Sequence, residues 1–438
     1  MKSLLRARFV RETDGAMGIY GLILFITICV IVGLSMDVAN GYKVRSEMQV
    51  AVDTAGHTAL YNRLADGKDA AITKAVNVAA QNLGTSDAGS AITAADVTFG
   101  TWDVNTKVFT PNPNSTSAVM VTAHRSASRL NAVKTFLLST VGVKAWEVTT
   151  QSVTETYRPP CLREGFVAEK VVDLQSNNGF YNGFCLHSNG TVKVNQNNYF
   201  EAGTVVSMPN TNNLQLPASG FVKNNGLLAA LRESFYNIRI LDRIAPIIAS
   251  LTAGSNTYMP AYVTNKTVKT ITIASASTKL SATNLVAGNI YYVSCSGNKT
   301  LTIDNNVTLK KVVVMTNCQV NFSQNDILED VIIGTTNTAD DSINWSSGFQ
   351  IGKDDHCATG GGAQLLTMGG MKSAAALEVF GAQLIAMKSI NFTANADGIE
   401  GASFIAGDTV SGTSNMSMGF CGSGMEQNFE VDYYRLAA

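Results

Sequence analysis

An uninterrupted run without a charged side chain, from Gly15 to Met36, constrains this chain more than any other feature. A helix rises about 1.5 Å per residue, so about 20 apolar residues span the roughly 30 Å hydrocarbon core of a bilayer, and this run is long enough. The apolar part of a cleaved signal peptide is shorter, about 7–15 residues, and ends at a small-residue cleavage site. The segment GLSMDVANGY matches such a site poorly. The sequence therefore predicts a retained membrane helix over residues 15–38, with Gly15, Met36 and Asp37 at its ends.

The charges that flank this run predict its orientation. Four basic residues precede it and two follow closely: Lys2, Arg6, Arg8 and Arg11 before, Lys43 and Arg45 after. Basic residues stay on the cytoplasmic side of a membrane, so residues 1–14 are expected to form a cytoplasmic tail. We therefore predict a single-pass protein of the bacterial inner membrane, with the later domains in the periplasm or at the cell surface.

Cysteine placement independently favours export. Cys29 lies in the apolar run, and the other six, an even number, follow it: Cys161, Cys185, Cys295, Cys318, Cys357 and Cys421. Six cysteines allow 15 pairings. Pairing along the chain, Cys161–Cys185, Cys295–Cys318 and Cys357–Cys421, closes the shortest loops and is favoured, with unpaired buried cysteines as the alternative. No two of the six have the close spacing of a zinc knuckle, so neither a metal nor a cofactor is expected.

The balance of charges argues against nucleic-acid binding. Charged residues make up only 15% of the chain, and 32 Lys and Arg nearly balance 33 Asp and Glu. Such a chain lacks the positive field that attracts phosphate backbones. The 37 glycines, together with many Asn, Thr, Ser and Val, instead suggest short strands joined by tight turns.

Residues 39–158 show the pattern of a helical stalk followed by a small α+β module. Val44, Met48, Val52, Ala55 and Ala59 recur at the spacing of one helix face, directly after the membrane span, so span and stalk can form one helix. The segments that follow are expected to be helices at 69–83 and 129–142 and strands at 96–104, 107–110, 117–125 and 144–157. The prolines of YRPPC end the module.

Residues 159–438 contain an internal repeat. GAQLLTM begins at Gly362, GAQLIAM at Gly381 and GASFIAG at Gly401, so the three copies start at nearly equal intervals. A period of about 20 residues suits one rung of a parallel β-helix, in which like residues stack inward. We therefore predict a right-handed parallel β-helix-like domain, with a β-sandwich as the alternative. Apolar residues at helical spacing, including Leu227, Leu231 and Phe235, predict a helical insertion at about 222–250.

The N-terminal residues RFVRETDGAMGIYGLILFI and GLSMDVANGYKVRSEMQVAVDTAGHTAL resemble TadG-like and TadE-like proteins of bacterial Flp (tight-adherence) pilus systems. The likeness is clearest up to about residue 65 and extends more weakly to about residue 155. Asp14–Gly15 and Asp37–Val38 occupy the family's entry to and exit from the membrane. The resemblance implies an envelope protein with a structural or adhesive role, whose partners are pilus-assembly proteins or pilus subunits, membrane lipid through the anchor, and surface glycans.

One group of residues suggests an enzyme instead. Parallel β-helices often carry clustered carboxylates that bind calcium or act as acid and base on polysaccharides. The candidate residues here are Asp340, Asp341, Asp354, Asp355 and His356. They lie in polar loops, where acidic pairs are usually solvated, and fold analogy does not establish an activity. A structural role is therefore favoured, and a membrane-tethered polysaccharide lyase or hydrolase is the alternative.

Overall fold

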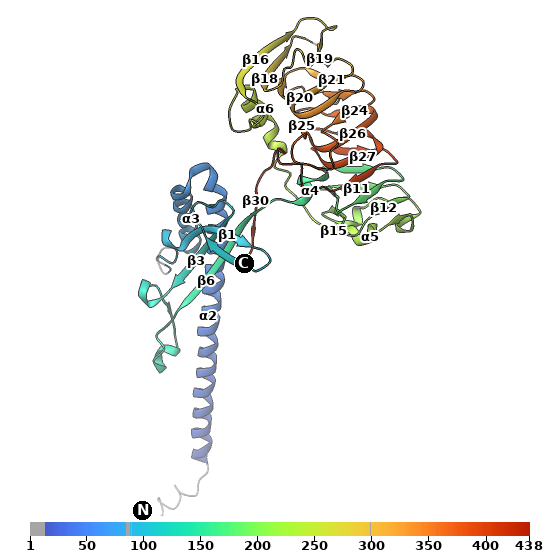
Figure 1. Ribbon diagram of the computed structural model, residues 1–438. Coiled ribbons are helices and arrows are strands. Elements are labelled where there is room, and N and C mark those ends of the chain that lie inside the picture. The colour runs from blue at the N-terminus through green and yellow to red at the C-terminus, as the bar shows by residue number, and fades with distance from the viewer. Residues whose placement is uncertain (1–13, 85–87, 89, 298) are drawn as a thin grey trace, which may run out of the picture. The chain divides into compact units, whose positions relative to one another are not determined.

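The computed structural model describes residues 14–438 except 85–87, 89 and 298, and divides them into two units (Figure 1). The first unit extends to Tyr157 and includes Asp432–Ala438, and the second comprises Arg158–Val431. The sequence placed residues 159–438 in one domain. Strand β30 (Tyr433–Leu436) corrects this boundary, because it pairs with β6 (Val148–Tyr157) of the first unit.

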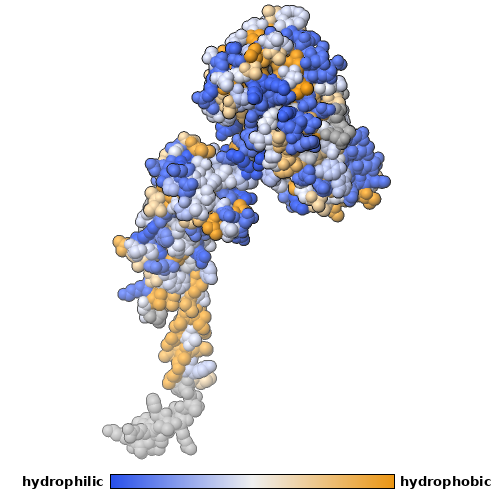
Figure 2. All heavy atoms as spheres, viewed as in Figure 1, coloured by the Kyte–Doolittle hydropathy of each residue, from blue (hydrophilic) through white to orange (hydrophobic). Residues whose placement is uncertain are grey.

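The first unit is built on one continuous helix, α2 (Asp14–Asp66), which confirms that span and stalk run together. Helix α3 (Lys68–Leu83) packs beside it, and both cover an antiparallel sheet of order β2-β1-β3-β6-β30. Its other strands are β1 (Val97–Asp103), β2 (Val108–Pro111) and β3 (Ala118–Arg125). The predicted stripe of α2, from Val44 to Ala59, is buried in this core. The apolar end of α2 is largely uncovered by the rest of the described chain, as Figure 2 shows in orange.

The helix predicted at 129–142 is wrong. This segment instead begins a hairpin of β4 (Val133–Lys134) and β5 (Ala145–Trp146), joined through a short 3-10 helix, η3 (Leu138–Val141). We call residues 133–146 the foot. Its amides at 136–138 donate to Asp37 instead of to helical carbonyls, which explains why apolar residues in a helix-like run did not form a helix.

The second unit is a parallel β-solenoid, as the repeat predicted (Figure 1). Its strands form three faces. The first face is formed by β7 (Gly165–Ala168), β10 (Cys185–Ser188), β13 (Val205–Met208), β15 (Leu231–Glu233), β16 (Asn265–Ile273), β18 (Asn289–Cys295) and β25 (Ala363–Thr367). The second is formed by β8 (Val171–Leu174), β11 (Thr191–Val194), β17 (Lys279–Leu280), β19 (Thr300–Ile303), β21 (Gln319–Phe322), β23 (Ile343–Trp345) and β28 (Thr409–Gly412). The third is formed by β9 (Gly179–Tyr181), β12 (Asn198–Phe200), β14 (Asn224–Asn225), β24 (Phe349–Ile351) and β29 (Ser417–Gly419).

Four long strands turn the corners between faces and contribute to more than one: β20 (Thr308–Thr316), β22 (Ile327–Thr335), β26 (Met371–Ala386) and β27 (Ile390–Ala406). The repeats at 362, 381 and 401 lie on the first face, where Leu365, Leu384 and Phe404 pair in register. Their side chains are fully buried inside the solenoid. The like residues of the repeat therefore stack inward, as its period indicated.

The rungs are not stacked in chain order. The last rung, β27–β29, pairs with the first, β7–β9. After β15 the chain leaves the stack and re-enters at its opposite end through β16. The connecting segment contains α6 (Ile244–Thr252), whose apolar side packs on the outer side of the first face against residues such as Val313 and Ile385. The helical insertion expected at 222–250 is thus only partly helical: α5 (Leu227–Ala230) and α6 are separated by β15, which extends the sheet.

Candidate binding face of the solenoid

The second face has one side in the core and the other in solvent, because its strands alternate apolar and polar residues. In β21, Val320 and Phe322 are buried while Gln319 and Asn321 point outward. The same alternation occurs in β19, β28, β8 and β11. Successive side chains of a strand point to opposite sides of a sheet, so each rung adds one outward polar side chain at the same position.

These outward positions form a continuous row, which we call the polar ladder. Each member pairs in register with the next, in the order Lys279, Thr302, Asn321, Asn344, Lys372, Asn391, Ser411, Asp173, Lys193 and Gln215. Neighbouring strands lie about 4.8 Å apart, so these nine steps extend over about 43 Å. The face therefore presents amide and hydroxyl groups at a regular spacing along a line.

The charges of this face are largely compensated. Lys279 Nζ lies 3.0 Å from Asp304 Oδ1, and this hydrogen bond lowers the pKa of Asp304. At the edge of the face, Lys388 Nζ lies 2.6 Å from Asp340 Oδ1 and lowers the pKa of that carboxyl. Between these charged residues the face carries neutral polar side chains, such as those of Thr302, Asn321 and Asn344. Such a face suits a neutral polar ligand better than a polyanion.

A shallow hollow of about 200 Å³ lies at one end of the polar ladder. Asp173, Lys193 and Gln215 of the ladder line it together with Gln175 and Asn195. Lys193 Nζ is 4.0 Å from Asp173 Oδ2, so the hollow contains one loose ion pair and several amides. It offers a ligand that follows the ladder a place to insert a side group.

The structure does not bring together the carboxylates that the sequence singled out. Asp340 and Asp341 lie in the turn between β22 and β23, whereas Asp354, Asp355 and His356 lie in the loop between β24 and β25. These are different corners of the solenoid, separated by the length of β25, about 16 Å. Asp355 Oδ1 accepts the Ala358 amide at 3.0 Å, and Asp340 pairs with Lys388. Among the residues the structure describes, no cluster of three or more His, Cys, Asp or Glu is placed to hold a metal.

The six cysteines of the second unit lie in pairs that match the favoured connectivity. Cys161–Cys185 joins the short helix α4 (Pro160–Arg163) to β10, and Cys295–Cys318 joins adjacent rungs. Cys357–Cys421 joins the β24–β25 loop to the segment after β29. Cys29 is free and exposed on α2.

The residues named as membrane-anchor markers have different environments. Gly15 and Met36 belong to α2, and the Met36 side chain is exposed. Asp37 is buried, and its carboxylate accepts hydrogen bonds from the amides of Phe136, Leu137 and Leu138 at 2.5–3.0 Å. Sequence reasoning found Asp37 but not its partners, and it recognised polar strands in the solenoid without identifying which residues align.

Comparison with known families identifies the second unit. Residues 165–422, more than half of the chain, match a family model described as "Domain of unknown function (DUF7867)". The chain belongs to the DUF7867 family. The DUF7867 match begins at the first residue of β7 and ends just after β29, so it covers the solenoid with its helical connection.

A second match covers the first unit. Residues 55–153 match a family model described as "Putative Tad-like Flp pilus-assembly". This confirms the suspected relation to Tad-like proteins, and places it over the α+β module, where the sequence resemblance was the weaker. This member of the DUF7867 family therefore joins a Tad-like module with a long apolar helix to a β-solenoid.

Other comparisons add little. No curated protein matches the chain. An ice-binding protein from the Antarctic ascomycete Antarctomyces psychrotrophicus matches at 12% identity, over 59% of this chain and 95% of that one, with a TM-score of 0.17. A similarity this low carries no argument about the function of the DUF7867 solenoid.

Proposed function

We propose that this protein is a membrane-anchored, exported component of a bacterial Flp (tight-adherence) pilus system, with a structural or adhesive role rather than an enzymatic one. The observation that carries the proposal is the joining of a Tad-like pilus-assembly domain to a helix long and apolar enough to cross a membrane. The basic residues before the span support a cytoplasmic N-terminus in the inner membrane. Three disulfides in the second unit support an oxidising compartment outside it.

Within this role, the polar ladder is the proposed contact surface. Its partners are pilus subunits, pilus-assembly proteins or surface glycans, all of which display neutral amide or hydroxyl groups. A regular row on a disulfide-linked solenoid costs little conformational entropy on binding, because its side chains are already held in register by the strands. The same row offers no paired carboxylates for acid–base catalysis, which favours binding over turnover.

Labelling of cysteines in intact cells tests the topology. A membrane-impermeant thiol reagent is expected to label none of the six cysteines of the second unit before reduction, and to label the partly exposed Cys295, Cys357 and Cys421 after reduction. Cys29 stays unlabelled in both conditions because it lies in the membrane span. Absence of labelling even after reduction would place the solenoid in the cytoplasm and contradict the proposal.

Substitutions on the polar ladder test the contact surface. The double variant Asn321→Arg, Asn344→Arg places two bulky charges on adjacent ladder positions, and is expected to lower surface attachment or pilus recovery of cells that carry it. The control is Gln350→Arg, which places one such charge on the outer side of the third face, and Asn321→Arg alone is the single variant matched to it in charge. Equal behaviour of the ladder variant, the control and the wild type, with disulfides formed in all, would remove the ladder from the proposed role.

A further inference from the structure

The foot docks against one stripe of α2 whose members recur every four residues. Leu137 packs against Gly33, the amides at 136–138 donate to Asp37, and the Trp146 ring packs against Gly41. A side chain at Gly33 would overlap Leu137, whose Cβ lies 2.8 Å from the position of the added Cβ. Gly33, Asp37 and Gly41 are buried, in contrast to the exposed apolar residues around them. The foot is therefore fixed at a defined position along the axis of α2, between Gly33 and Gly41.

The Gly33 end of this contact lies within the uncharged segment. Gly33 is three residues inside its end at Met36, which corresponds to about 5 Å along a helix. Below this contact an apolar groove of about 270 Å³ is lined by α2 side chains between Phe25 and Leu34, together with Leu137, Leu138 and Thr140 of the foot. If residues 15–36 cross the hydrocarbon core, the tip of the foot shares that layer, because it contacts the same turns of α2.

The foot also carries exposed apolar side chains. Phe136 is 68% exposed, Leu137 43% and Val143 42%. Three large apolar side chains on a loop of this size carry a free-energy penalty in water. Lys134 and Lys144, both exposed, flank them at the base of the hairpin, where a basic side chain can reach lipid phosphates.

Much of the backbone of the foot is hydrogen-bonded within the described chain. Besides the three amides on Asp37, three hydroxyl groups donate to carbonyls of the foot itself: Thr135 to Val143, Ser139 to Phe136 and Thr140 to Leu137, at 2.5–2.6 Å. The Val143 amide donates to Leu138 O at 3.0 Å. Internal pairing of this kind, together with the packing of the foot on α2, lowers the cost of placing non-helical backbone at membrane depth.

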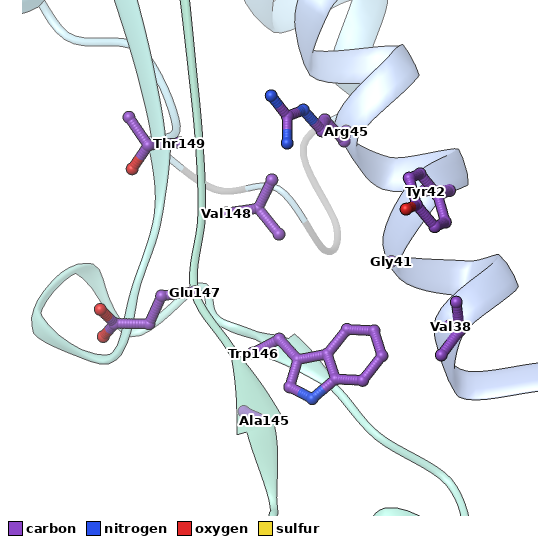
Figure 3. Close-up of a pocket in the computed structure, with 9 residues that line it drawn as sticks. All are labelled: Val38, Gly41, Tyr42, Arg45, Ala145, Trp146, Glu147, Val148 and Thr149. Carbon is purple, nitrogen blue, oxygen red and sulfur yellow. The ribbon is translucent and has the colours of Figure 1, made fainter. Parts of the chain in front are cut away.

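A more polar pocket lies just above the foot. Figure 3 shows the Trp146 ring directed toward α2 at Gly41, and Arg45 extending across the gap toward Val148. Tyr42 also lines this pocket of about 600 Å³. These positions are five to nine residues past Met36, about 7–14 Å beyond the end of the uncharged segment, which extends from the outer edge of the headgroup layer into the adjoining water. Trp and Tyr are enriched at membrane–water interfaces.

We infer that the foot is a lipid-immersed element: residues 135–143 enter the outer leaflet beside α2, with Trp146 and Tyr42 at the outer edge of the headgroup layer. The occupant of the apolar surface is therefore lipid rather than a second protein. This goes beyond the proposed pilus role and rests only on α2 crossing the membrane. It gives the protein two contacts with the bilayer, which restrict tilting of the first unit relative to the membrane plane.

Tryptophan scanning of the full chain in phosphatidylcholine vesicles tests the inference. The emission of Phe136→Trp, after subtraction of the parent protein with its three tryptophans, is expected to be quenched by lipids brominated on the acyl chain and spared by aqueous iodide. Val143→Trp is expected to behave alike, so a folding defect in one variant does not decide the outcome. Both sites are already exposed, so the new ring displaces no core residue.

Two further variants calibrate the measurement. Ile23→Trp, exposed in the middle of the span, reports on the anchor itself, and Leu130→Trp, 95% exposed on the α+β module, reports on an apolar residue in water. Quenching of Phe136→Trp by iodide, as for Leu130→Trp, would overturn the inference while leaving the anchor intact. Protection from both quenchers would overturn it in favour of a protein partner. Failure of bromolipids to quench Ile23→Trp would overturn the anchor as well.

Discussion

At the residue scale, His187 shows how the solenoid holds a titratable group in its neutral form. Its side chain is fully buried, with Nδ1 2.8 Å from Ser207 Oγ and Nε2 2.9 Å from Asn189 Oδ1. The Asn189 amide is oriented by donating to Glu169 and to the Tyr236 carbonyl, so its oxygen accepts from the imidazole. Burial lowers the pKa of His187 to about 4, and the hydrogen bond to Asn189 acts in the opposite direction.

This predicts an acid-dependent loss of stability. The unfolded chain takes up a proton on His187 near pH 6.5, whereas the folded chain does so only near pH 4, so the free energy of unfolding falls as pH drops between these values. The full loss is about 3 kcal/mol. Denaturant unfolding of the wild type and His187→Gln at several pH values measures it: the variant is less stable at neutral pH but lacks this slope.

Asp326 also changes stability with pH, but it is present in both proteins that are compared. Burial raises its pKa to about 6, so it contributes stability at acid pH that is lost as pH rises, the opposite sign to His187. Because both proteins contain Asp326, its effect cancels in the difference between them. A difference between wild type and His187→Gln that is independent of pH would contradict the assignment.

At the element scale, the sequence predicted α2 well because its signals are local. The uncharged run indicates an apolar environment and the Val44–Ala59 stripe indicates a buried helix face. Both lie on the observed helix. The foot could not be predicted in this way. Its structure depends on Asp37, which lies far earlier in the chain, and on glycines at 33 and 41 whose small size matters only once the foot is in place.

A substitution in α2 isolates this contact. Gly33→Leu is expected to push the foot off the helix, because the new side chain overlaps Leu137. The expected readout is faster hydrogen exchange at amides 136–138, which lose their bonds to Asp37. Gly21→Leu is the matched control, since a Cβ at Gly21 meets nothing within 4 Å on the same apolar helix. Equal exchange in the two variants would mean that the foot does not depend on Gly33.

At the scale of the whole molecule, the repeat predicted a solenoid but not the order in which its rungs stack. The segments at 362, 381 and 401 are neighbours in both chain and stack, so their similarity was visible. The pairing of β27 with β7 joins segments from opposite ends of the solenoid sequence, and nothing in a short pattern marks it. The same holds for β30, which completes the sheet of the first unit from the far end of the chain.

Removal of residues 432–438 is expected to weaken the first unit selectively. The deletion exposes the edge of β6 and leaves Glu155, 7% exposed, without Arg435, whose Nη2 lies 2.7 Å from its carboxylate. Arg435→Ala alone is expected to cost about 1 kcal/mol, because the arginine is half exposed. Limited proteolysis should show earlier cleavage within 97–157 while the solenoid stays resistant. Unchanged cleavage in the deletion variant would show that β30 contributes nothing to stability.

The pairing of the last rung with the first has a consequence for how the chain matures. In a chain whose exported part crosses the membrane in sequence order after the anchor, β7–β9 emerge early, yet the strands that cover their edge follow much later: the Met416 amide donates to Asn178 across 238 residues. Until then that edge is an open template for wrong pairing. Contacts so distant in sequence also form slowly. In such an exported chain, closure of the solenoid is set by the end of translocation, and the early rungs need protection until the later ones arrive.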